Sequence, residues 1–328
     1  MTVQTHPYAE LSPEAVLDAV ESFGFDIDAR VFALNSYENR VYQVGLADGR
    51  FIVVKFYRPG RWSLEQILEE HQFSRELQDL EIPVIAPMEF RDCGSLQLWN
   101  GFQVAVFPHF VGRPPELDNL DNLLVMGRFI GRIHAVGAMS RFEHRPALTV
   151  EKFGLASREF ILQNDFLPSD LVAAYDSLTV NLLARIEDAF AQKKIHTLRI
   201  HGDCHMGNVL WKNDTPNFVD FDDTMTGPAI QDLWMLLSGD RNQRQAQLLD
   251  IVEGYNEFHD FRPGELVLVE PLRCLRMMHY AAWLARRWQD PAFPLSFPWF
   301  NTERYWADHV LELREQAAML EEPPLELM

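Results

Sequence analysis

The sequence predicts an α+β protein with two lobes: an N-terminal lobe of antiparallel sheet plus one helix over residues 1–110, and a mainly helical C-terminal lobe over residues 111–328. Two observations lead to this class. A chain of 328 residues with 47% hydrophobic residues is long enough to build the core of a bilobed protein. Strand patterns dominate before residues 112–115, and helical periodicity dominates after them.

The strands of the N-terminal lobe are predicted from alternating and β-branched segments. Residues 41–44 and 51–56 flank Asp48 and Gly49, a pair that suits the tight turn of a hairpin. A further strand over residues 103–107 runs into a proline, which cannot donate to a ladder and so marks a strand end.

Helices are predicted where apolar residues recur every three to four positions. Ser63 and Gln66 have the spacing of a capping box, so a helix starts there and ends before Pro83. In the C-terminal lobe, the apolar and glycine pattern over residues 120–134 predicts a helix that packs closely against a neighbour. Further helices are expected over residues 230–237, 265–288 and 303–320.

Composition excludes several classes of protein. The net charge of −19 repels nucleic acid and anionic membrane surfaces; it suits a cationic partner, or simply solubility. Three widely separated cysteines argue against a secreted disulfide scaffold. No export signal and no apolar run of membrane-spanning length is visible, so a cytoplasmic location is expected.

Three oxygen-bearing side chains are predicted to converge around a second hairpin. A short strand at residues 198–200 leads into HGDCHMGN, which contains Asp203 and Asn208, and strands at 209–211 and 218–221 follow. Pairing these strands brings Asn208 close to Asp220. One carboxylate and one amide are a plausible protein contribution to a Mg²⁺ site, and Asp203 is left to accept a proton from an attacking hydroxyl. Alternatively, all three are turn or strand-end residues.

Lys55 lies inside the apolar strand predicted over residues 51–56. An ammonium group is costly to bury without an anionic partner, so phosphates, a helix glutamate or both should meet it; otherwise the lysine reaches solvent at the strand end. Glu69 and Glu70 both flank the apolar face of the following helix, and periodicity does not choose between them.

Two other groups near the hairpin have competing interpretations. His201, Cys204 and His205 are residue types that bind zinc, but a structural site needs four ligands at suitable spacing, so they are interpreted as loop and core residues. Asp232 points away from the apolar face of its predicted helix and is exposed unless another element covers it.

The chain resembles the aminoglycoside phosphotransferase and choline kinase group. The resemblance rests on the H-G-D-x-H-x-x-N motif at residues 201–208, and it extends nearly end to end through LNSYENRVY (34–42), VKFYRP (54–59), WLARRW (283–288) and DPAF (290–293). It implies the protein-kinase-like fold, with ATP and Mg²⁺ as cofactors. It further implies transfer of phosphate to a hydroxyl, with serine and threonine of proteins in a stress response as the acceptors.

The resemblance also implies roles for individual residues. Asp203 would accept the proton, and Asn208 and Asp220 would hold Mg²⁺, with Asp220 also catalytic. Lys55 would meet the ATP phosphates with Glu70 as its partner. Ser36, Phe107 and His109 would contact the nucleotide, and Asp232 would brace the catalytic loop.

The loop around Ser36, the acceptor and the activity itself each have an alternative interpretation. The loop around Ser36 has no glycine, unlike the glycine-rich loop of protein kinases, so Ser36 is equally compatible with an ordinary turn residue. The acceptor could instead be a small molecule such as an amino alcohol, homoserine or an aminoglycoside. A nucleotide-binding pseudoenzyme is a third reading, which the full set of Lys55, Asp203, Asn208 and Asp220 disfavours.

Overall fold

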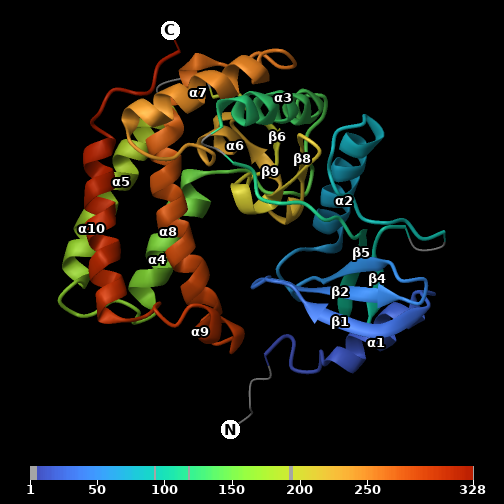
Figure 1. The fold of residues 1–328 in the computed structure, drawn as a ribbon. Coiled ribbons are helices and arrows are strands. Elements are labelled where there is room, and N and C mark those ends of the chain that lie inside the picture. The colour runs from blue at the N-terminus through green and yellow to red at the C-terminus, as the bar shows by residue number, and fades with distance from the viewer. Residues whose placement is uncertain (1–5, 92–93, 117–118, 192–194, 328) are drawn as a thin grey trace. The chain divides into compact units, whose positions relative to one another are not determined.

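The computed structural model describes residues 6–91, 94–116, 119–191 and 195–327, and their contacts form two compact units (Figure 1). The first unit comprises residues 1–116, 142–145 and 205–224, and the second comprises 117–141, 146–204 and 225–328. The contacts thus group the second predicted hairpin with the N-terminal strands. A division into lobes at residue 110 stays a prediction.

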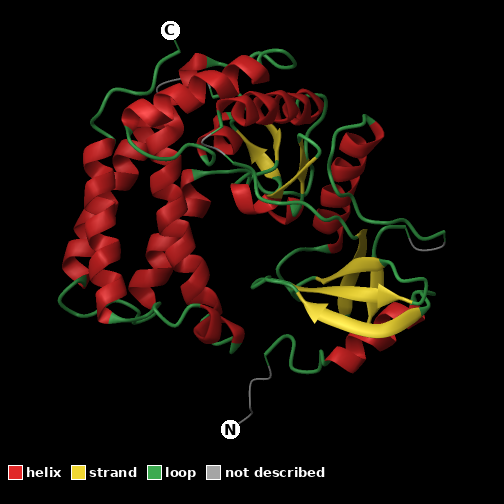
Figure 2. Cartoon of the chain, viewed as in Figure 1, coloured by secondary structure: helices red, strands yellow, loops and turns green. Residues whose placement is uncertain are grey.

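The first unit is built on a five-stranded antiparallel sheet in the order β1-β2-β3-β5-β4 (Figure 2). The strands are β1 (Ile27–Ala33), β2 (Arg40–Leu46), β3 (Phe51–Phe56), β4 (Gln97–Trp99) and β5 (Phe102–Pro108). The predicted hairpin is confirmed as β2–β3, with Gly49 in its turn at a φ of 87°, a backbone conformation that favours glycine.

One helix packs on each face of this sheet. Helix α1 (Pro13–Ser22) covers the face that carries Val54 and Phe56 of β3. Helix α2 (Leu64–Asp79) begins with the predicted capping box of Ser63 and Gln66, and its Ile67 packs with Ala105 of β5. Because side chains alternate along a strand, Lys55 lies on the α2 face.

The second hairpin of the first unit differs from its predicted register. Its strands are β7 (Val209–Lys212) and β8 (Thr215–Phe218), so the predicted strand over residues 218–221 was wrong. The turn lies at Asn213 and Asp214, which have φ values of 51° and 56°. Pro216 is tolerated inside β8 because this ladder has only two strands, and an edge proline need not donate.

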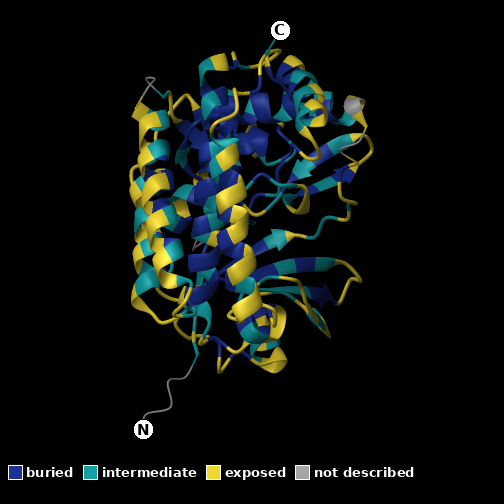
Figure 3. Ribbon diagram, turned by 90° about the vertical axis from the view of Figure 1, so that its left-hand side faces the viewer, coloured by how far each residue is buried: buried dark blue, intermediate teal, exposed yellow. Residues whose placement is uncertain are grey.

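The second unit is mainly helical. Its helices are α3 (Leu120–Gly137), a π-helical turn η1 (Glu151–Leu155), α4 (Ala156–Gln163), α5 (Val172–Ala191), α6 (Ile230–Trp234), α7 (Arg241–Tyr255), a 3₁₀ segment (Pro263–Leu268), α8 (Val269–Arg287), α9 (Ala292–Ser296) and α10 (Glu303–Met319). A short two-stranded ladder pairs β6 (Leu198–Ile200) with β9 (Met225–Gly227). Helix α8 contacts both α4 and α10, and buried positions concentrate on the inner sides of the helices (Figure 3).

The close packing predicted for the helix at residues 120–134 is confirmed. Gly127 of α3 lies against the backbone oxygen of Ile251 on α7, and Gly254 of α7 lies against the oxygen of Leu124. A side chain at either glycine would overlap the facing backbone, so the glycines set the distance between the two helices. Among the described residues, no helix combines the length and the apolar character that crossing a membrane requires.

Candidate active site

Lys55 is buried on the α2 face of the first sheet, with only 5% of its surface exposed. Its strand neighbour on β5 is the small residue Ala105, which leaves room for the long side chain. The ammonium group therefore does not reach solvent at a strand end.

Three carboxylates surround the Lys55 ammonium. Its Nζ lies 3.0 Å from Oδ1 of Asp220, 3.1 Å from Oδ1 of Asp222 and 3.7 Å from Oε1 of Glu70. Burial alone would lower the pKa of Lys55, but Asp220 and Asp222 raise it well above its ordinary value. Lys55 is therefore charged, and the anionic partner that its sequence position requires is present in the same unit.

The structure distinguishes the two glutamates that periodicity left open. Glu70 is 2% exposed and faces Lys55, and burial raises the pKa of its carboxyl to about 7. Glu69 instead accepts hydrogen bonds from the backbone amides of residues 143, 144 and 145, at 2.6, 2.8 and 2.7 Å. Glu70 is therefore the ion-pair partner of Lys55, and Glu69 anchors a segment of backbone.

Asp222 is a member of this cluster that sequence reasoning missed. It is 3% exposed, and besides Lys55 it pairs with the Arg61 guanidinium. Arg145 donates to the backbone oxygens of Asp222 and Thr224, at 2.5 and 2.8 Å. Burial alone would raise the pKa of Asp222, but Arg61 and Lys55 hold it well below its ordinary value. The only sequence signal was a run of acidic residues after Asp220.

The end of the second hairpin brings Asn208 and Asp220 together. The backbone amide of Val219 donates to the oxygen of Asn208 at 3.0 Å, which confirms the predicted proximity of the two segments. Asp220 follows in a left-handed conformation with a φ of 59°, which aspartate adopts more readily than most residues. This backbone bend turns its carboxylate toward Lys55, while 54% of the Asp220 side chain stays exposed.

The donor set at this hairpin suits Mg²⁺ better than zinc. A carboxylate and a carboxamide are hard oxygen donors, and Mg²⁺ completes its coordination with water and phosphate oxygens. Within the described ranges, no group of three or more His, Cys, Asp or Glu side chains has a metal-binding arrangement. His201 and Cys204 are both buried, and burial raises the pKa of the Cys204 thiol well above its ordinary value.

Asp232 holds the segment that precedes Asp203 in the second unit. Its carboxylate accepts the backbone amides of His201 and Gly202, at 2.7 and 2.8 Å, and lies 3.0 Å from Nε2 of His134 on α3. Asp232 is 1% exposed, so the alternative of an exposed residue was wrong: α3 and the 201–202 segment cover it. The expectation that Asp232 braces this loop is confirmed.

Asp203 belongs to the second unit and has a partner that the sequence did not reveal. Nη1 of Arg276, on α8, lies 2.6 Å from Oδ1 of Asp203. Arg276 is 73 positions further along the chain, so no local pattern could indicate this pair.

The predicted nucleotide contacts are distributed over the first unit. The Ser36 hydroxyl donates to the backbone oxygen of Asn39 at 3.2 Å, within the loop between β1 and β2. Phe107, near the end of β5, packs with the α2-facing cluster, and the His109 ring lies 5.6 Å from that of Phe51. Their contacts with a nucleotide stay a prediction.

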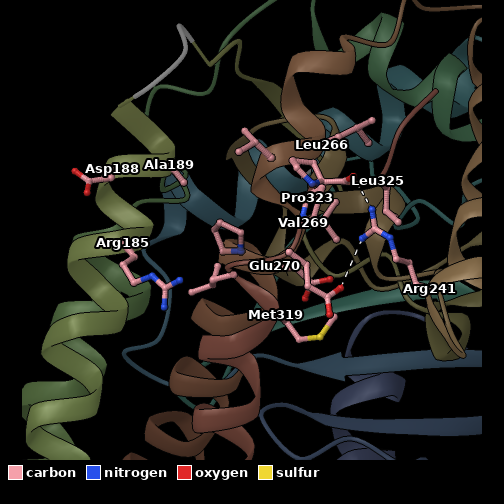
Figure 4. A pocket seen from close by; sticks show the side chains of 15 residues that line it. Arg185, Asp188, Ala189, Arg241, Leu266, Val269, Glu270, Met319, Pro323 and Leu325 are labelled. Carbon is pink, nitrogen blue, oxygen red and sulfur yellow. Dashed lines mark hydrogen bonds and ion pairs between the residues drawn. The ribbon is translucent and has the colours of Figure 1, made fainter. Parts of the chain in front are cut away.

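A pocket in the second unit contains none of these residues. Side chains from α5, α8 and α10 line it beneath the C-terminal segment (Figure 4). Arg241 also lines it, donates to the backbone oxygen of Pro324 at 2.8 Å and pairs with Glu322 at 3.8 Å. These contacts hold residues 322–324 against α7.

The sequence and the fold both resemble those of known proteins. The model of the phosphotransferase enzyme family matches residues 30–266. Stress response kinase A of Escherichia coli is 46% identical over 320 residues, which cover 98% of this chain and 97% of the relative. Serine/threonine protein kinase RdoA of Salmonella typhimurium is 45% identical over 320 residues, with the same shares covered.

A solved structure shows the same fold at low sequence identity. Amicoumacin kinase hAmiN, in complex with AMP-PNP and Ca²⁺, aligns with a TM-score of 0.74 and 18% identity, over 92% of this chain and 93% of that one. This likeness confirms the predicted two-lobed protein-kinase-like fold.

Proposed function

Because this chain belongs to the phosphotransferase enzyme family, we propose that it transfers the γ-phosphate of ATP to serine or threonine hydroxyls of proteins, in a cytoplasmic stress response. The names of two relatives, stress response kinase A and serine/threonine protein kinase RdoA, support the acceptor and the role.

The observation that carries the proposal is the charged, buried Lys55 with its three carboxylates. Phosphoryl transfer requires the protein to position groups and to neutralise charge on phosphate oxygens. A lysine held by a helix glutamate on one side and by the aspartate after a hairpin on the other is suited to that task. The fixed ammonium is the group that would contact the phosphates, and Ser36, Phe107 and His109 would contact the rest of the nucleotide.

The proposed reaction assigns one role to each remaining group. The acceptor oxygen forms a bond to the γ-phosphorus, the bond from that phosphorus to the β–γ bridging oxygen breaks, and ADP leaves. The hydroxyl proton passes to the Asp203 carboxylate. Asn208 and Asp220 would hold Mg²⁺, which when bound neutralises charge on the phosphate oxygens.

A transfer assay with a matched pair of variants tests the proposal. With Mg²⁺ and radiolabelled ATP, the wild-type protein should label protein acceptors, and Asp203→Asn should abolish labelling while ATP binding measured by calorimetry persists. Asp214→Asn is the control, because Asp214 is an exposed turn residue at which asparagine tolerates the same left-handed backbone. Full labelling by Asp203→Asn would refute the assignment.

The second candidate is a small-molecule kinase, which the fold shared with amicoumacin kinase favours. Label in ethanolamine, homoserine or an aminoglycoside, with none in proteins, would establish it. ATP binding without any transfer would instead indicate a pseudoenzyme.

A further inference from the structure

We propose that the accepting serine or threonine lies beside an acidic segment of its polypeptide, and that Arg276 and the cations near it on α8 bind the acidic side chains. The inference rests on the proposed function and specifies its substrate. It contrasts with the cationic acceptor that the net charge of −19 by itself would favour.

Arg276 lies where an acceptor must bind. The proposed proton acceptor Asp203 has to touch the acceptor hydroxyl, and the Arg276 guanidinium already lies 2.6 Å from one oxygen of that carboxylate. The Arg276 side chain is 42% exposed, so an incoming group can reach it. A guanidinium in this position attracts carboxylates and repels the ammonium groups of amino alcohols or lysine side chains.

Other cations surround the same stretch of α8. His279, one turn after Arg276, is partly buried, and its ring packs against Phe153 of η1 with the two ring centroids 4.5 Å apart. Burial lowers the pKa of His279 to about 3. The positive charges of four nearby cations lower it further; they are Arg286, Arg287, Lys152 and Arg276. These four residues, three on α8 and Lys152 on η1, are here called the α8 cation cluster.

Two members of the α8 cation cluster lie on the same face of α8. Arg276, Tyr280, Trp283 and Arg287 recur at helical spacing on one face. Tyr280 stacks on Trp283 at 5.7 Å, and the Arg287 guanidinium lies over the Trp283 ring at 5.4 Å. Eleven residues of helix span about 16 Å, a distance that about five residues of extended chain cover. Acidic residues within about five positions of the phosphorylated residue would therefore reach the cluster.

Binding of an acidic segment also prepares the proton acceptor. A substrate carboxylate that pairs with Arg276 competes with Asp203 for the same guanidinium, so the acceptor hydroxyl can donate to Asp203 in place of Arg276. Proton transfer and phosphoryl transfer then proceed as proposed above.

The test uses the full-length protein, Mg-ATP and two peptides of equal length that present one serine, flanked either by glutamates or by lysines. We expect kcat/KM to favour the glutamate peptide by about tenfold or more. Arg276→Gln should raise KM for the glutamate peptide and reduce this preference, whereas loss of a purely structural residue would impair both peptides equally. Arg304→Gln is the control, because the Arg304 side chain is 92% exposed on α10 and should leave the preference unchanged.

Other outcomes distinguish the inference from the proposed function. Equal use of the two peptides, or preference for the lysine peptide, overturns the inference and leaves the proposed function standing. Transfer to ethanolamine alone overturns both the inference and the protein acceptor. ATP binding without transfer to any acceptor overturns the proposed function and the inference with it.

A binding measurement keeps the test independent of turnover. A glutamate peptide in which alanine replaces the serine should bind the wild-type protein, and Arg287→Gln should weaken that binding. Unchanged binding in both Arg287→Gln and Arg276→Gln overturns the inference.

Discussion

Replacing Asp222 by asparagine tests whether the carboxylate missed from sequence holds the Lys55 cluster together. Asp222 is 3% exposed and pairs with both Lys55 and Arg61. Asp222→Asn therefore removes the anion that the buried Lys55 shares with Arg61, whose side chain is 12% exposed. Removing one partner of a buried ion pair costs about 3–5 kcal/mol. Asparagine keeps the shape and part of the hydrogen bonding, so we expect a loss near the lower end, about 3 kcal/mol.

The neighbouring residue supplies a matched control. Asp223 also pairs with Arg61, at 2.6 Å, but its side chain is 40% exposed, so Asp223→Asn should cost only about 0.2–1 kcal/mol. Urea unfolding, followed by tryptophan fluorescence, gives both values. Equal losses for the two variants, or a loss below about 1 kcal/mol for Asp222→Asn, would refute the view that burial decides the strength of these pairs. Calorimetry should also show weaker ATP binding by Asp222→Asn, because Lys55 is then less firmly held.

Three further predictions concern the second unit. Asp232→Asn should speed hydrogen exchange at the Gly202 amide and lower stability by about 3 kcal/mol; unchanged exchange would contradict the bracing role. Burial raises the pKa of Glu265 from 4.5 to about 7, so its contribution to stability is present below pH 4.5 and lost as pH rises through 7. As pH rises from 4.5 to 7, the free energy of unfolding of Glu265→Gln should therefore increase relative to that of the wild type, by up to about 3 kcal/mol in urea unfolding. A difference between the two proteins that does not change with pH would contradict this. Gly127→Ala should lower the melting temperature, at a cost of about 1–3 kcal/mol, because the new methyl meets the Ile251 oxygen; a gain in stability would contradict close helix packing.

Local sequence patterns determined much of the fold. The Asp48-Gly49 turn, the capping box at Ser63 and the glycines of α3 each act through their own backbone or nearest neighbours, so short-range rules predict them. The register of the second hairpin was predicted less well. Strand β8 begins at Thr215 and includes Pro216, which a two-stranded ladder tolerates because an edge proline need not donate. Which strands pair is a tertiary fact that the local pattern does not contain.

Some residues of the candidate site could likewise be predicted from local sequence, and others could not. Lys55 could be predicted because a charge inside an apolar strand needs an anion, whichever anion the fold supplies. Local patterns left open the choice between Glu69 and Glu70 and the burial of Asp232, which only the family resemblance indicated. The burial of Asp222 and the contact of Arg276 with Asp203 were decided only by tertiary structure. These side chains are chemically ordinary in sequence. The energies of their ion pairs and hydrogen bonds depend on removal from water and on partners many residues away. Both conditions exist only once the chain has folded.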